Sequence, residues 1–200
     1  MRGKKEDLGQ NLTAEEAAEY TEAYQRGGDL VMKHIDLHDR EPAPSPAREA
    51  EVREGIRLLQ RAVALEPRSW PAHWLIGKGY QVLDDHPGAY EAFRQATRLC
   101  TENADVPREL CLECLHLGKF PEAVEAAQLA LLLKRSDPGL QANLALALLL
   151  AGDVDGALDY AEEAVARDPE DEINRNLLAV IREVKEGRRQ QPKTLAELEA

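Results

Sequence analysis

The chain has 200 residues, a formal net charge of −12 and an aromatic content of only 4%. Nucleic acids and anionic membrane surfaces are recognised by basic patches, so 37 acidic against 25 basic residues argue against both as partners. The 3 cysteines are few and odd in number, which argues against a disulfide framework and favours a reducing compartment.

No segment has the length and hydropathy of a membrane span. The most apolar stretch, residues 144–151, falls far short of the roughly 20 residues that cross a bilayer. The first residues, Met-Arg-Gly-Lys-Lys-Glu-Asp, lack the apolar run of a signal peptide. We therefore expect a cytoplasmic protein without membrane insertion, in which residues 1–12 form a disordered tail.

The first predicted helical hairpin spans residues 13–69 and is degenerate. Small and apolar side chains recur at helical spacing in two stretches of it: Tyr24, Gly27, Gly28 and Val31, then Gly55, Leu59, Ala62 and Val63. Three prolines, Pro42, Pro44 and Pro46, lie between the two stretches. Because proline interrupts helices, residues 36–46 are predicted to be an inserted loop.

From Trp70 onward, small residues recur every 34 positions. The series are Ala89, Ala123 and Ala157; Ala96, Ala130 and Ala164; and Gly77, Cys111 and Ala145. A fixed period of this length is typical of stacked helical hairpins, in which small side chains let neighbouring helices approach closely. The period predicts three hairpins, at 70–103, 104–137 and 138–171, a capping helix at 172–187 and a C-terminal tail at 188–200.

These units resemble the tetratricopeptide repeat (TPR), whose pattern is W-x2-L-G-x2-Y…A-x3-F…P. The unit at 70–103 carries His73, Ile76, Gly77, Tyr80, Ala89, Phe93 and Ala96 at the matching positions. The resemblance implies an all-α fold, a TPR-like right-handed solenoid of antiparallel helical hairpins. It also implies a non-catalytic surface that binds other proteins.

In the TPR family the first helices of successive units line a concave groove, which fixed repeat positions face. Carried onto this sequence, the resemblance implies a groove set of Trp74, Lys78, Arg108, Leu112, Leu115, His116, Asn143, Leu146, Leu149, Leu150, Asn176, Leu177 and Val180. This set is rich in leucine, and soluble proteins rarely leave such a patch uncovered. We therefore expect an adaptor or small chaperone that holds an apolar or amphipathic segment of a partner protein.

Other ways of covering these leucines stay open. The chain's own tail could fold back, since Leu195 and Leu198 lie on a short helix-like stretch after Pro192. A second copy of the chain could supply the cover, which would make the protein a self-associating assembly module. The curvature of the solenoid could also bury the leucines against neighbouring units, with no ligand involved.

One TPR subtype binds the C-terminal carboxylates of heat-shock chaperones through Lys, Asn and Arg side chains. Arg108 and Asn143 match two of the required positions. The other polar positions are occupied by Leu112, Ile173 and Leu177, which cannot compensate a carboxylate. We therefore expect a different ligand from that of this subtype.

The spacing Cys111-x2-Cys114 has the form of half a zinc site, but no second pair follows and a structural zinc needs four ligands. Free cysteines are commonly buried as small apolar residues, so we expect both to pack in the core. The sequence also lacks a phosphate-binding loop and a nucleophile motif. It therefore predicts no catalytic residue, no metal and no cofactor.

Overall fold

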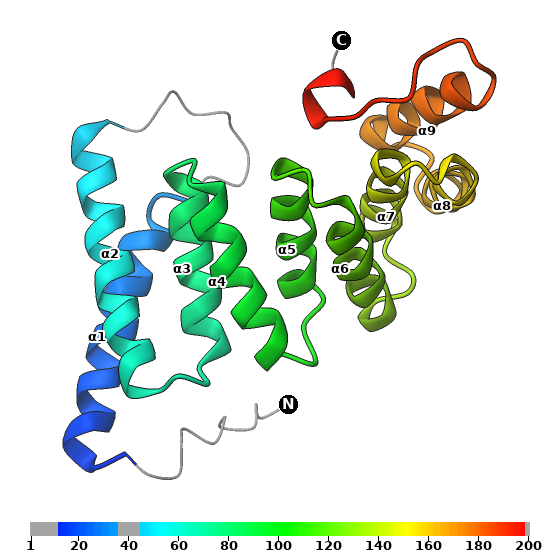
Figure 1. Ribbon diagram of the computed structural model, residues 1–200. Coiled ribbons are helices and arrows are strands. Elements are labelled where there is room, and N and C mark those ends of the chain that lie inside the picture. The colour runs from blue at the N-terminus through cyan, green and yellow to red at the C-terminus, as the bar shows by residue number, and fades with distance from the viewer. Residues whose placement is uncertain (1–11, 36–44, 199–200) are drawn as a thin grey trace. The chain divides into compact units, whose positions relative to one another are not determined.

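The computed structural model describes residues 12–35 and 45–198, and over these ranges the chain is helical and contains no strand (Figure 1). The prediction of an all-α fold of TPR-like hairpins is confirmed. Almost all of the expected N-terminal tail, and most of the proline-rich loop, lie outside the described residues. The chain forms two compact units, residues 1–101 (unit 1) and residues 102–200 (unit 2).

The described residues of unit 1 form two helical hairpins. Its helices are α1 (Ala14–Met32), α2 (Pro46–Leu65), α3 (Trp70–Val82) and α4 (His86–Leu99). Helix α1 packs against α2, α3 packs against α4, and α3 also contacts both α1 and α2. Each helix starts at a residue whose side-chain oxygen accepts a backbone N–H bond, namely Thr13, Ser45, Ser69 and Asp85.

Helices α1 and α2 approach each other closely because two glycines face one another. A Cβ placed on Gly27 would lie 2.9 Å from the carbonyl oxygen of Gly55, and one on Gly55 would lie 3.0 Å from that of Gly27. Next to this contact, Val52, Ile56 and other apolar side chains form a buried core. The backbones therefore meet at a distance that no larger residue allows.

The start of α2 corrects one prediction. Pro46 was expected to end the inserted loop, but it is the first residue of α2. The oxygen of Ser45 accepts a bond from the backbone N–H of Arg48 at 3.3 Å. Serine before proline is a favourable helix start, because proline in the first turn has no N–H to leave unpaired.

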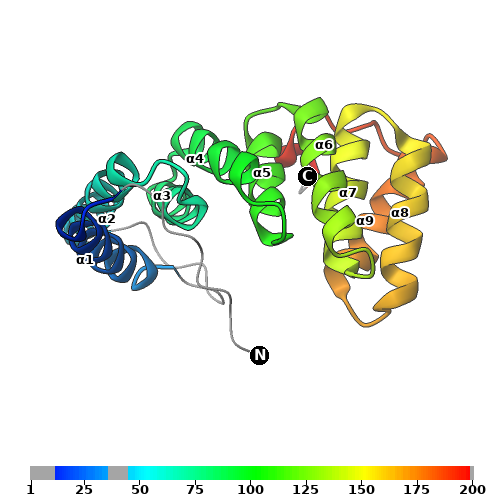
Figure 2. The ribbon, with the colours of Figure 1, turned by 90° about the horizontal axis from the view of Figure 1, so that it is seen from below.

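Unit 2 continues the same packing. Its helices are α5 (Asp105–His116), α6 (Phe120–Leu133), α7 (Pro138–Ala151), α8 (Val154–Arg167) and α9 (Glu172–Lys185), followed by the 3-10 helix η1 (Leu195–Leu198). Helix α7 packs against α6 and α8, and α9 packs against α7 and α8 (Figure 2). The first helices of successive hairpins also touch, α5 with α7 and α7 with α9.

The residues of the 34-residue series lie in the cores of the two units. The small side chains at these positions are buried: Ala89, Ala96, Cys111, Ala123, Ala130, Ala145, Ala157 and Ala164. At Gly77 a Cβ would lie 2.6 Å from the ring of Phe93. The period in the sequence is therefore a period of helix–helix contacts, as the spacing predicts.

The turn inside each hairpin after the first repeats at the same period. Gly118 and Gly152 have φ angles of 68° and 97°, in the left-handed region that favours glycine. The matching position of the α3–α4 hairpin is Asp84, with φ 57°. Aspartate is one of the few other residues that enters this region, so the backbone shape is kept without glycine.

Candidate functional site

The structure divides the predicted groove set between the two units. Trp74 and Lys78 lie one turn apart on α3, with the Lys78 ammonium 5.8 Å from the centroid of the Trp74 ring. The other members of the set lie on α5, α7 and α9 in unit 2.

Three leucines of the set are core residues of unit 2. Leu115, Leu149 and Leu150 are 2%, 0% and 4% exposed. They therefore stabilise the fold and offer almost no surface to a ligand. This outcome agrees with the alternative in which packing within the chain covers part of the groove leucines.

A narrower apolar surface remains on the first helices of unit 2. Leu112 on α5, Leu146 on α7 and Val180 on α9 are half-buried and are each separated by 34 residues. We call these three residues the apolar row. Half-buried or exposed members of the set complete the surface: Arg108, His116, Asn143, Asn176 and Leu177.

Arg108 is engaged within its own helix. Its guanidinium lies 2.9 Å from the Glu109 carboxylate and 3.2 Å from that of Asp105. Burial alone would lower the pKa of Arg108, but the hydrogen bond with Glu109 and the nearby carboxylates raise it overall. Arg108 therefore stays charged with its charge already balanced, which makes it a poor clamp for a ligand carboxylate.

The C-terminal tail folds back onto α7. The Gln191 side-chain amide donates to the carbonyl of Leu149 at 3.1 Å, and the next residue, Pro192, is buried. Arg189 donates to the carbonyls of Glu197 and Leu198 at 2.9 and 3.0 Å, which closes the tail on itself. Figure 1 shows this segment, in red, turning back after α9.

Unit 1 contains a hollow of about 550 Å³ between α1 and α3. We call it the apolar hollow; it is lined by Tyr24, Gln25, Gly28, Asp29, Met32 and Leu75. All of its lining residues except Leu75 lie on α1, and the predicted groove set contains no residue of this helix. The signal was the spacing Tyr24-x2-Gly27-Gly28-x2-Val31, which places Gly28 on α1 at the repeat position that Gly77 has on α3; both glycines are buried.

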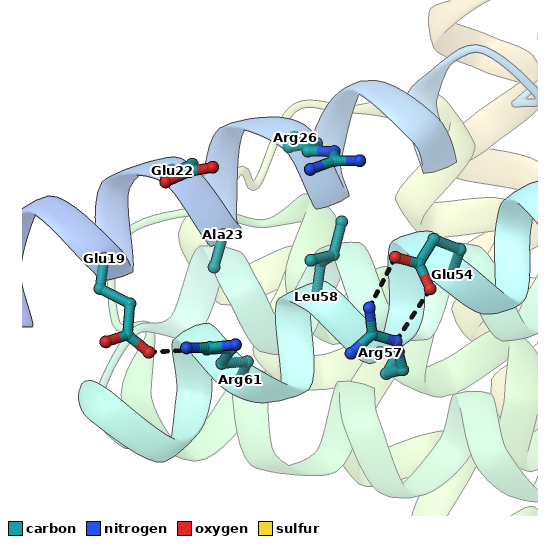
Figure 3. Close-up of a pocket in the computed structure, with 8 residues that line it drawn as sticks. All are labelled: Glu19, Glu22, Ala23, Arg26, Glu54, Arg57, Leu58 and Arg61. Carbon is teal, nitrogen blue, oxygen red and sulfur yellow. Dashed lines mark hydrogen bonds and ion pairs between the residues drawn. The ribbon is translucent and has the colours of Figure 1, made fainter.

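A second hollow, of about 390 Å³, lies between α1 and α2 (Figure 3). We call it the charged cleft; it is lined by Glu19, Glu22, Ala23, Arg26, Glu54, Arg57, Leu58 and Arg61. Arg61 pairs with Glu19 across the two helices at 2.6 Å, and Arg57 pairs with Glu54 within α2 at 2.7 Å. The Arg61–Glu19 ion pair connects the two helices of the hairpin. The three carboxylates and three guanidiniums of the lining balance, so the charged cleft has no net charge that would attract a charged ligand.

Cys111 and Cys114 are buried on α5. Burial raises the pKa of each thiol to about 12, so neither is a thiolate near neutral pH. Within the described part of the chain, no cluster of His, Cys, Asp or Glu is arranged to hold a metal ion.

Known proteins share this architecture. No family model matches the chain. Crystal structures of MamA (TM-score 0.72, 17% identity, 85% of this chain and 84% of that chain) and of YrrB, a TPR protein with an unusual peptide-binding site (0.63, 22%, 76% and 78%), superpose well. The chain has a tetratricopeptide-repeat fold.

Further similar proteins are a peptide-binding TPR domain and members of a larger complex. The second TPR domain of human RPAP3, solved with an HSP70 peptide, matches 53% of this chain and 88% of its own length at TM-score 0.51 and 22% identity. Among curated proteins, BBSome complex member BBS4 from Xenopus tropicalis is 29% identical over 123 residues, and the Bos taurus protein is 27% identical over 133. These matches cover 61% and 66% of this chain, which spans only 23% and 25% of those relatives.

No helix among the described residues is long and apolar enough to cross a bilayer.

Proposed function

We propose that the chain is a non-catalytic adaptor or small chaperone whose TPR surface holds an apolar or amphipathic segment of another protein. The observation that carries the proposal is the apolar row, Leu112, Leu146 and Val180, which is half-buried on three consecutive first helices of unit 2. Covering the exposed part of such side chains is favourable by about 25 cal/mol for each Å² of apolar surface removed from water. A bound apolar segment would supply that cover.

The comparisons support binding of a peptide segment in general. YrrB has a peptide-binding site, and RPAP3 domains bind HSP70 and HSP90 peptides. This chain differs where the acidic chaperone tails would bind, because Leu112 and Leu177 replace polar residues and Arg108 is balanced by Glu109 and Asp105. We therefore propose an apolar ligand in place of an acidic one.

The proposal is tested by replacing Leu146 and Val180 together with Asn. Both side chains are half-buried, so the variant should fold. The matched control is Leu132→Asn, on the second helix α6, where the side chain is 59% exposed. Each protein is used to capture partners from lysate of its native cell, with crosslinking and mass spectrometry, after circular dichroism has verified helicity. The proposal predicts that the double variant loses partners that the control retains; identical partner sets from all three proteins would refute it.

The docked tail favours a second candidate, in which the chain covers this surface itself. Gln191 binds the backbone of α7 and Pro192 is buried, so the tail already occupies one end of that helix. Removal of residues 188–200 should then increase capture of partners by unit 2, or cause self-association visible by light scattering. Unchanged capture and an unchanged monomer would exclude this candidate.

A further inference from the structure

The two hollows beside α1 differ in their charge balance. In the charged cleft the carboxylates of Glu19 and Glu54 are paired with guanidiniums of the same cleft (Figure 3). Among the described residues that line the apolar hollow there is one carboxylate, that of Asp29, and no cation. A charge without a counter-ion at the edge of an apolar surface attracts the opposite charge. The apolar hollow is therefore a better candidate than the charged cleft for binding a ligand.

The wall of the apolar hollow suits an apolar side chain. Met32 is 51% exposed, and the ring of Tyr24 and the buried side chain of Leu75 line the same space. A flexible thioether adapts to differently shaped apolar partners. Gly28 leaves space in the hollow next to Leu75, since a Cβ at this position would already lie 3.3 Å from a methyl group of Leu75.

Asp29 has no counter-ion among the described residues. Lys33, the residue that follows α1, lies four positions after Asp29, where an i,i+4 ion pair would be expected. The Lys33 ammonium is instead 2.7 Å from the carboxylate of Glu51, which also binds His34 at 2.7 Å. The hydrogen bonds from Lys33 and His34 lower the pKa of Glu51, so this acceptor stays ionised and retains Lys33.

We infer that the apolar hollow binds a protein segment in which an apolar side chain lies next to a lysine or arginine. The apolar side chain enters between Tyr24, Met32 and Leu75, and the cation pairs with Asp29. The net charge of −12 favours the approach of such a basic segment. This inference rests on the proposed function, because it names the chemistry of one segment that the TPR surface would hold.

The test is a selection of displayed random heptapeptides on the full chain. Wild-type protein should enrich peptides with an apolar residue adjacent to Lys or Arg. Asp29→Asn should lose the enrichment of the basic residue, and Asp29→Lys should select Glu or Asp in its place. Asp159→Asn, which removes the same charge from the exposed face of α8, is the matched control and should select like wild type.

The bound position is read from amide chemical shifts of the full chain with one enriched peptide. The shifts should change at Gly28 and Met32, and the affinity should fall about two- to fivefold in Asp29→Asn, as expected for an exposed ion pair. Enriched peptides without a basic preference, or with shifts confined to unit 2, would overturn the inference but leave the proposed function intact. If wild-type protein enriches no peptide, the proposed function and the inference both fail.

Discussion

The α1–α2 and α7–α8 hairpins are two versions of one unit, held together in different ways. In the first, 19- and 20-residue helices meet through their backbones at Gly27 and Gly55. In the second, two 14-residue helices are separated by the buried side chains of α7 and the alanines of α8. The comparison teaches that the repeat requires its two helices to pack against each other, and that the residues at this helix–helix contact can range from glycine to leucine.

The two hairpins also differ in how their helices are connected. Gly152 turns α7 into α8 within two residues, whereas thirteen residues, 33–45, separate α1 from α2. The cost of closing a loop rises slowly with its length, so a long insert is compatible with the same pairing. Ion pairs such as Arg61–Glu19 then join α1 and α2 along the edge.

The largest expected effect is at the core of α7. Leu144 is fully buried, so Leu144→Ala should remove about 2–5 kcal/mol of unfolding free energy through lost burial and a residual cavity. In a repeat array each hairpin contacts mainly its neighbours. Hydrogen exchange should therefore accelerate in α7 and α8 and stay unchanged in α1 and α2. Equal acceleration in both hairpins would show that they unfold as one cooperative unit.

The second prediction concerns the glycine contact of the first hairpin. In Gly27→Ala the new methyl group would lie 2.9 Å from both the Gly55 carbonyl oxygen and Leu59, so α1 and α2 must move apart. Overpacking of this kind costs about 1–3 kcal/mol. The expected result is faster exchange in α1 and α2 and a lower denaturation midpoint. A midpoint equal to that of the wild type would mean that this hairpin tolerates an alanine contact, as α7–α8 does.

Much of this architecture follows from the sequence, because small residues at contact positions repeat every 34 residues. The glycines at 27 and 28 identify α1 as a first helix even though its loop to α2 is long. The sequence left open whether Leu149 and Leu150 are covered by neighbouring helices, by the tail or by a partner, and their burial follows only from the folded chain. The apolar hollow does not follow from the predicted groove set, which begins at Trp74 on α3, because most residues of its lining lie on α1.

A smaller effect is expected at the tight turn of the second hairpin. Gly152 has φ 97°, and a non-glycine residue held in the left-handed region costs about 1 kcal/mol or slightly more. Gly152→Ala should lower the denaturation midpoint. Gly139→Ala is the matched control, because Gly139 lies in the first turn of α7 with ordinary backbone angles and should gain a few tenths of a kcal/mol from helix propensity. Two variants with the same change in midpoint would contradict this account of the turn.

The smallest effect concerns the pH dependence of the helix starts of the two hairpins. Burial tends to raise the pKa of Asp137, but the hydrogen bonds from Lys134 and the Leu140 backbone outweigh it, so the pKa is lowered from its ordinary value of 3.8. A carboxyl with a lowered folded-state pKa adds stability that is fully present above its unfolded pKa and is lost as pH falls through the folded one. Asn caps helices about as well as Asp, so Asp137→Asn removes the titration and keeps the cap.

The difference between wild type and Asp137→Asn should therefore be at most about 0.5 kcal/mol near neutral pH, because solvent screens the partly exposed carboxylate. In denaturation experiments it should shrink once the pH falls below the ordinary pKa of 3.8, and disappear below the lowered folded-state pKa of Asp137. Glu16→Gln at the start of α1 should behave in the same direction, since the backbone N–H and hydroxyl of Thr13 lower the pKa of Glu16. If the difference between Asp137→Asn and wild type were constant across this pH range, the helix start of α7 would depend on geometry alone, and the two hairpins would differ in this respect as well.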